Sequence, residues 1–242
     1  MKFFNLQNFS LKDMTEMGRA VRNLGRSDIL GDALFTQVVQ IFHKCLLDEE
    51  ARPASALVRI FCTRPFSDLN ARQKEFALNL LANTEYTAST KCLTLLATAG
   101  EKPEWNSVTS SKGHLAIPLA NLSVVEKAPM IASLIQQLGL EIRAVLTPPD
   151  DLIVEMDQKT YNVFHVPHAL GSPFIPDQEF VKNHGIKSAL GFGGMMPTGD
   201  LFAVLIFSKV SISKETAELF RPMALNVKLA LLPSFQTQMV DA

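Results

Sequence analysis

The side chains best suited to binding a metal ion or a haem are histidines and carboxylates in the last third of the chain. A possible ligand set consists of His165, His168, His184, Asp177 and Glu179. His165 and His168 lie at the end of a predicted strand, where side chains three residues apart point to opposite faces. They converge on one ion only if Pro167 turns the chain. We therefore interpret these histidines as loop and pocket-wall residues and predict no metal site.

Three glycines in the same region, Gly191, Gly193 and Gly194, could be taken for a phosphate-binding loop. A dinucleotide fingerprint would need glycine at position 196, which is Met196, and a helix directly afterwards. Glycines within a strand instead permit a bulge, or the close approach of another backbone or a ligand. The sequence contains no Walker motif, Gly-x-Ser-x-Gly elbow or His-Glu-x-x-His helix, so it predicts no catalytic constellation.

Composition narrows the class of protein further. The net charge is −1 and no cluster of Lys and Arg is present, which argues against a nucleic-acid partner, because phosphates are bound by clustered positive charge. No run approaches about 20 apolar residues, so we expect no membrane span. Cys45, Cys62 and Cys92 are widely spaced in apolar patterns. They are therefore predicted to be buried, unreactive thiols of a cytoplasmic protein.

The elements that must position these residues are clearest near the C-terminus. Residues 186–190 alternate in polarity, and residues 201–207 form an apolar run of strand length. Residues 197–200 supply turn chemistry between them, so we predict an antiparallel hairpin.

A terminal helix should follow this hairpin. Ser213 can cap it, and apolar residues then recur at threes and fours. Pro222 is expected to kink this helix, and Pro233 is expected to end it. Residues 234–242 would then form a short tail.

The rest of the chain alternates between helical and strand patterns. Helices are predicted over residues 10–24, 28–48, 70–81, 129–138 and 178–182, and strands over residues 56–61, 91–98, 114–119, 141–146, 152–156 and 161–166. No repeat or linker divides these elements, so we predict one main domain over residues 28–233 with an N-terminal helical arm over residues 1–27.

The N-terminal arm carries a heptad-like apolar seam formed by Met14, Met17, Val21 and Leu24. Such a seam either packs on the domain of the same chain or pairs with a second copy as a dimer seam. The sequence is compatible with both.

The order of these elements resembles the GAF family of sensor domains found in bacterial signal-transduction proteins. The resemblance is clearest over residues 185–232, which hold the Gly-Phe-Gly-Gly strand, a turn, the Leu-Phe-Ala-Val-Leu-Ile-Phe strand and the terminal helix. It implies an α/β fold that leans to α+β, with a central, mainly antiparallel sheet of five to six strands. Helices pack on this sheet, and long helices form the N-terminus and C-terminus.

The resemblance also implies a ligand pocket, here under the loop formed by residues 166–184. Candidate pocket residues are Phe164, Val166, His168, Phe174, Phe180, His184, Phe192 and Met195. The Asn-Lys…Phe…Asp-Glu motif of cyclic-nucleotide-binding members is absent, and all three cysteines precede residue 93, so covalent bilin attachment is not expected. The cofactor or ligand is therefore left unidentified.

These features favour a regulatory domain of a cytoplasmic signalling protein that binds a small molecule and relays the signal through the terminal helices of a homodimer. A kinase, a cyclase or a transcription factor would be its output partner. The alternatives are a small cytoplasmic enzyme using the same pocket, and a dimerising scaffold without a ligand, which would have a filled pocket.

Overall fold

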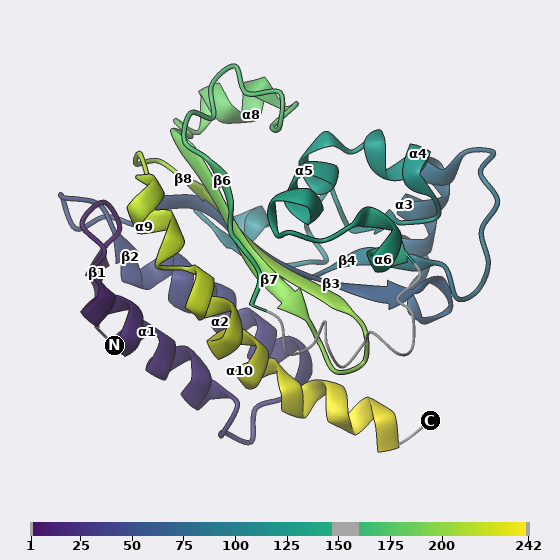
Figure 1. Cartoon of the computed structure of the whole chain (residues 1–242), viewed down its shortest axis with the longest axis horizontal. Coiled ribbons are helices and arrows are strands. Elements are labelled where there is room, and N and C mark those ends of the chain that lie inside the picture. The colour runs from purple at the N-terminus through teal and green to yellow at the C-terminus, as the bar shows by residue number, and fades with distance from the viewer. Residues whose placement is uncertain (1, 147–159, 241–242) are drawn as a thin grey trace.

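A six-stranded sheet forms the centre of the computed structural model, which describes residues 2–146 and 160–240 (Figure 1). In spatial order its strands are β5 (Ala116–Pro118), β4 (Lys91–Gly100), β3 (Ser55–Pro65), β8 (Leu201–Ser208), β7 (Ser188–Met195) and β6 (Phe164–Val166). Every pair of neighbouring strands in this sheet is antiparallel. The predicted α+β-leaning fold around a mainly antiparallel sheet is confirmed.

One face of the sheet is covered by the long helices α1 (Leu11–Leu24), α2 (Gly31–Cys45) and α10 (Arg221–Val240), as Figure 1 shows. Beside them, β1 (Phe4–Asn5) and β2 (Leu46–Leu47) form a short parallel pair. A hydrophobic core that includes Phe42, Phe192 and Phe220 fills the space between helices and sheet. Burial of this apolar surface holds the helices in place.

The other face carries shorter helices: α4 (Leu122–Glu126), α5 (Pro129–Gln137), α6 (Ile142–Leu146) and α8 (Gln178–Asn183). At the sheet edge, α3 (Ala71–Leu81) packs beside β5, and the single turns η1 (Phe66–Asp68) and η2 (Pro103–Trp105) flank this region. A second core, which includes Leu134, Phe164 and Leu205, lies under these helices.

The central strand β3 separates the two cores. Val58 and Ile60 belong to the core under the long helices, whereas Leu57 and Phe61 belong to the core on the opposite face. This division follows from the alternation of side chains along a strand. Arg59 lies among them on the face opposite the long helices, where it lines a cavity described below.

The predicted hairpin of β7 and β8 is confirmed, with a continuous register from Ser188 opposite Ser208 to Met195 opposite Leu201. Gly193 allows the two backbones to approach, because a Cβ there would lie 2.1 Å from the carbonyl oxygen of Phe202. Close approach of another backbone therefore explains this glycine, and the pairing contains no bulge at it.

The seam on α1 packs within the same chain. Met17 and Val21 are fully buried in the core that α1 shares with α10, and Met14 and Leu24 pack against its edge. Ser10 caps the helix as predicted, and it forms a capping box with Asp13. A homodimer contact through α1 would have to use the exposed side of the helix.

Residues 141–146 were predicted as a strand, and this prediction is wrong. Residues Ile142–Leu146 form α6, in which Ile142 and Val145 are both buried in the second core. Their spacing of three residues suits one face of a helix. The β-branched composition that suggested a strand is overridden by this packing. The strand predicted over residues 152–156 lies outside the described residues.

The single terminal helix predicted after Ser213 is in fact two helices. Ser213 caps α9 (Lys214–Glu218), and α10 begins at Arg221. Pro222 therefore occupies the first turn of α10, where a missing N–H needs no replacement, and it does not kink a continuous helix.

Pro233 was expected to end the terminal helix, and this is also wrong, because α10 continues through it to Val240. Leu231 and Phe235 on either side of Pro233 are buried in the core, and Phe235 packs against Phe35 of α2. This packing offsets the backbone hydrogen bond that proline removes.

The other predicted elements are confirmed with shifted ends. The strand predicted over residues 161–166 is reduced to β6, and the helix predicted over residues 28–48 ends at Cys45 because Leu46 is extended and pairs with β1. In the part of the chain that the structure describes, no helix has both the length and the apolarity needed to cross a lipid bilayer.

Candidate ligand-binding site

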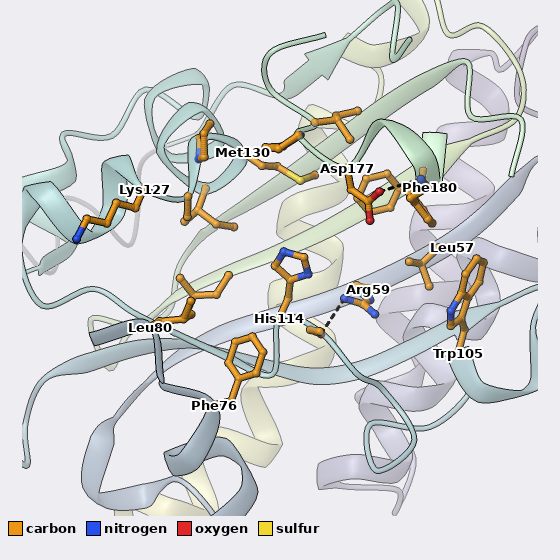
Figure 2. A pocket seen from close by; sticks show the side chains of 18 residues that line it. Leu57, Arg59, Phe76, Leu80, Trp105, His114, Lys127, Met130, Asp177 and Phe180 are labelled. Carbon is orange, nitrogen blue, oxygen red and sulfur yellow. Dashed lines mark hydrogen bonds between the residues drawn. The ribbon is translucent and has the colours of Figure 1, made fainter. Parts of the chain in front are cut away.

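A cavity of about 440 Å³, partly open to solvent, lies on the face of the sheet that carries the short helices (Figure 2). Its floor comes from β3, β5 and β8, and its walls come from α3, η2, the start of α5, and α8 with the residues before it. It is lined by Leu57, Arg59, Phe76, Leu80, Trp105, Gly113, His114, Ile117, Lys127, Ala128, Pro129, Met130, Ile131, Ile175, Pro176, Asp177, Phe180 and Phe207. Its volume lies within the range of about 300–1,000 Å³ usual for small-molecule sites.

Aromatic rings form one end of this cavity. The ring centroid of Phe180 lies 5.8 Å from that of Trp105 and 5.2 Å from that of Phe207, both in edge-to-face arrangements. His184 packs on the same group, with its ring 4.6 Å from Trp105. Three separate elements, η2, α8 and β8, therefore meet in one apolar wall.

Arg59 brings a positive charge to this apolar site. It is 9% exposed, and its Nη1 donates to the carbonyl of Gly113 at 3.2 Å while Nη2 donates to Ser111 Oγ at 3.1 Å. Its buried Nε has no hydrogen-bond partner among residues 2–146 and 160–240. Burial lowers the pKa of Arg59 to about 10, which still leaves the guanidinium charged at neutral pH.

The loop that contains residues 109–113 is held by a second arginine. Arg72 of α3 donates from Nη2 to the carbonyl of Ser111 at 2.7 Å and from Nη1 to the carbonyl of Thr109. The next residue after this loop, His114, has a φ of 58°, in the left-handed region. Hydrogen bonds from Arg59 and Arg72 therefore hold this loop at the edge of the cavity.

Three further groups that can carry charge line the cavity: His114, Lys127 and Asp177. His114 projects into the cavity in Figure 2. The surrounding protein atoms lower the pKa of His114, the charge of Arg59 adds to this effect, and Asp177 opposes it. Asp177 also caps α8, since its Oδ1 accepts a hydrogen bond from the Phe180 N–H at 2.8 Å. The cavity therefore combines a cationic floor with a carboxylate at the start of α8.

Of the eight pocket residues predicted from sequence, all of which the structure describes, only Phe180 lines the cavity. His184 adjoins it through Trp105 and Phe180. Phe164, Val166 and Met195 are buried in the core on the same face of the sheet.

The other three predicted residues lie away from the cavity. Phe192 points to the opposite face, where its ring lies 5.3 Å from Phe42 and 5.6 Å from Phe220. His168 and Phe174 are exposed. Phe192 lies on that face because side chains alternate along β7, and the sequence pattern did not specify which set faces which side.

Sequence reasoning missed Arg59, Trp105 and His114. One signal was available for Arg59, because a charged residue within a run of buried-strand residues usually has a partner or a function. The contribution of α3 and of residues 109–114 had no comparable signal, since it depends on contacts between distant segments.

The histidines considered as metal ligands lie at different places. His165 Nε2 lies 3.0 Å from the carbonyl oxygen of Ile212, whereas His184 packs on Trp105. Within residues 2–146 and 160–240, no group of three or more His, Cys, Asp or Glu side chains is placed to hold a metal ion.

The three cysteines are buried, as predicted. Cys45, Cys62 and Cys92 are free and buried. Burial raises the pKa of each thiol, to about 12 for Cys92, so the reactive thiolate form is suppressed at neutral pH.

Comparison with known proteins identifies the fold. No protein-family model and no curated protein sequence matches the chain. Among solved structures, the GAF domain of a phosphoenolpyruvate-protein phosphotransferase from Coxiella burnetii aligns with a TM-score of 0.52 at 9% identity, over 96% of this chain and 99% of that chain. The phycoerythrobilin-bound GAF domain of a cyanobacterial phytochrome aligns with a TM-score of 0.43 at 11% identity, over 93% and 96% of the two chains. The first of these two alignments shows that the chain has a GAF-like fold, as the sequence resemblance implied.

Proposed function

We propose that this chain is a regulatory domain that senses a small molecule in the cavity. The observation that carries the proposal is the cavity itself, which is mostly apolar, contains a few convergent polar groups and lies on one face of a GAF-like sheet. Sites of this kind are typical of small-molecule binding. An open cavity also favours a sensor over a ligand-free scaffold, for which a filled pocket is expected.

Signal relay is proposed to run across the sheet. Leu57 and Arg59 of β3 face the cavity, whereas Val58 and Ile60 of the same strand contact the core under α1, α2 and α10. A ligand that shifts β3 or the segment before α8 would alter the packing of the long helices. The ligand can change the free-energy difference between the two arrangements by no more than the difference between its binding free energies for them.

The output is proposed to pass through a homodimer to a kinase, cyclase or transcription partner. On α10, Leu225 and Leu229 are exposed, 58% and 38%, and four residues apart they share one side of the helix. A second copy packing on this side would cover both. Leu225→Lys combined with Leu229→Lys should convert a dimer to a monomer in sedimentation velocity, and an unchanged dimer would exclude this contact.

The sensing proposal is tested first by native mass spectrometry of freshly purified protein, with an absorbance scan of the same sample. Ala128 lines the cavity at the start of α5 and its side chain makes no capping hydrogen bond, so Ala128→Phe should fill the cavity without removing a polar contact. The matched control is Ala20→Phe, on the exposed side of α1. We expect a retained small-molecule mass in wild type and in the control, and its loss from Ala128→Phe.

If no molecule is retained, a fragment library is screened by thermal shift on the same three proteins. Hits that stabilise wild type and Ala20→Phe but not Ala128→Phe support the proposal. A wild-type protein that binds no fragment, or hits that Ala128→Phe retains, would contradict it.

A further inference from the structure

The charge of Arg59 has no counter-charge in the part of the chain that the structure describes. None of the ion pairs among those residues includes Arg59, and burial is the cause of its lowered pKa, without an opposing carboxylate. Asp177, which also lines the cavity, forms none of these ion pairs with Arg59. A buried charge without a partner is costly, so proteins normally pair it.

Anchoring of the loop does not account for this charge. Gly113 and Ser111 each accept one N–H of Arg59, out of the five that a guanidinium offers. Both acceptors are neutral, so a neutral donor could serve them, and Arg72 already holds Thr109 and Ser111 from the other side. What Arg59 adds beyond these contacts is a positive charge at the wall of the cavity.

The other residues that line the cavity indicate what kind of molecule it would bind. Leu57, Phe76, Ile117 and Phe207 are apolar, and the Trp105 and Phe180 rings close one end. Such walls favour an aryl or alkyl body through apolar burial and ring contacts. The lining also holds Lys127 and Asp177, whose opposite charges offset each other. One net positive charge, that of Arg59, therefore remains for the ligand, which suits a single negative charge.

We infer that the ligand is a small monocarboxylate with an apolar body, whose carboxylate pairs with Arg59 while the body lies against the aromatic end of the cavity. The planar guanidinium fork matches a carboxylate better than an ammonium would. This inference rests on the proposed function of the same cavity, and it specifies the chemical class of ligand.

The test compares acids with their neutral amides. The probes are 3-phenylpropanoate, 4-phenylbutanoate and octanoate, each with its primary amide, titrated by calorimetry at pH 7.5. Trp105 is the single tryptophan of the chain and lines the cavity, so its fluorescence reports binding independently. In wild type, at least one acid should bind about tenfold or more tighter than its amide, a difference of about 1.4 kcal/mol.

Variants assign this preference to Arg59. Arg59→Gln should remove the preference for acid and leave amide affinity within about threefold, whereas Arg59→Lys should keep part of it because the charge remains. The matched control is Arg72→Gln, which loosens the same loop without touching the cavity lining. It should keep the full preference. If Arg72→Gln removes the preference as well, loop position and not the Arg59 charge is responsible, and the inference fails.

The outcomes also separate this inference from the proposed function. Amides that bind wild type as tightly as acids, with both lost in Ala128→Phe, would overturn the carboxylate inference and leave a sensing cavity. Binding of neither series, together with no fragment binding in the preceding experiment, would overturn both. The wild-type comparison needs no variant, so poor folding of Arg59→Gln does not prevent a decision.

Discussion

Gly25 at the end of α1 lies directly against the backbone of Ala230 in α10: a Cβ at position 25 would be 2.7 Å from the Cα of Ala230 and 2.8 Å from its carbonyl oxygen. About two helical turns earlier, a Cβ at Gly18 would meet only the side chain of Asn226, at 2.7 Å. The two glycines sit on the same side of α1, but what opposes them differs, since a backbone cannot rotate away and an amide side chain can.

Gly25→Ala should therefore destabilise the protein by about 1–3 kcal/mol, as overpacking against a fixed backbone does. The φ of Gly25 is −68°, so the substitution adds no backbone strain of its own. Gly18→Ala is the matched control and should change stability by less than about 1 kcal/mol, because better helix propensity offsets the displaced side chain. Urea unfolding of both variants provides the measurement. Equal effects at the two positions would show that α1 adjusts freely on α10.

Asp200→Ala should cost about 1–3 kcal/mol, because Asp200 joins the β7–β8 turn to two other strands. Its Oδ1 accepts hydrogen bonds from Lys91 Nζ at 3.0 Å and from Thr63 Oγ1 at 3.1 Å, and Thr63 Oγ1 in turn accepts from the Leu201 N–H. The control is Glu16→Ala, which removes an exposed ion pair with Lys2 and should cost less than about 1 kcal/mol. Denaturant midpoints compare them. A cost for Asp200→Ala no larger than that of the control would contradict this role.

Phe192→Ala and Phe180→Ala should distinguish a core residue, whose loss lowers stability, from a cavity residue, whose loss weakens ligand binding. Phe192 is fully buried between Phe42 and Phe220, so its truncation should cost about 3–5 kcal/mol. Phe180 is half-buried and lines the cavity, so its truncation should cost less stability and weaken ligand binding more. Calorimetric titration at a temperature where both variants are folded measures the second effect. If Phe192→Ala weakened binding more than Phe180→Ala, the ligand would lie on the face of the sheet that carries the long helices, and the proposed cavity would not be its site.

The free energy of unfolding should fall as the pH is lowered from 7.5 to 5.5, in part through His43. Burial lowers the pKa of His43 below its ordinary 6.5, Glu101 opposes this, and Lys209 and Lys44 reinforce it. The unfolded chain therefore binds a proton before the folded protein does as the pH falls through about 6.5. The stabilisation is complete above that pH and is lost below it, at most by about 1.4 kcal/mol per pH unit for one group.

His43→Asn should reduce this dependence, since asparagine does not titrate and its amide takes the position of the imidazole Nδ1, which lies 2.9 Å from Ser55 Oγ. Urea unfolding at pH 7.5 and 5.5 gives the difference for both proteins. An equal loss in variant and wild type would assign the pH dependence to other groups.

Local patterns in the sequence predicted most of the elements. The caps at Ser10 and Ser213, the hairpin of residues 186–207 and the strands that became β3 and β4 all follow from side-chain chemistry and periodicity within a few residues. The resemblance to GAF domains then implied the antiparallel sheet and a pocket near α8, because the order of elements restricts how they pack.

Tertiary structure decided what depends on distant contacts. Pro233 remains inside α10 because Phe235 packs on Phe35, and residues 142–146 are helical because two of their side chains enter the core. The cavity also depends on such contacts, since Arg59, Trp105 and Phe180 come from segments far apart in the chain. Periodicity assigns a side chain to one face of its own element, but only the packing of elements fixes which faces meet, and the ligand site lies where they meet without filling the space.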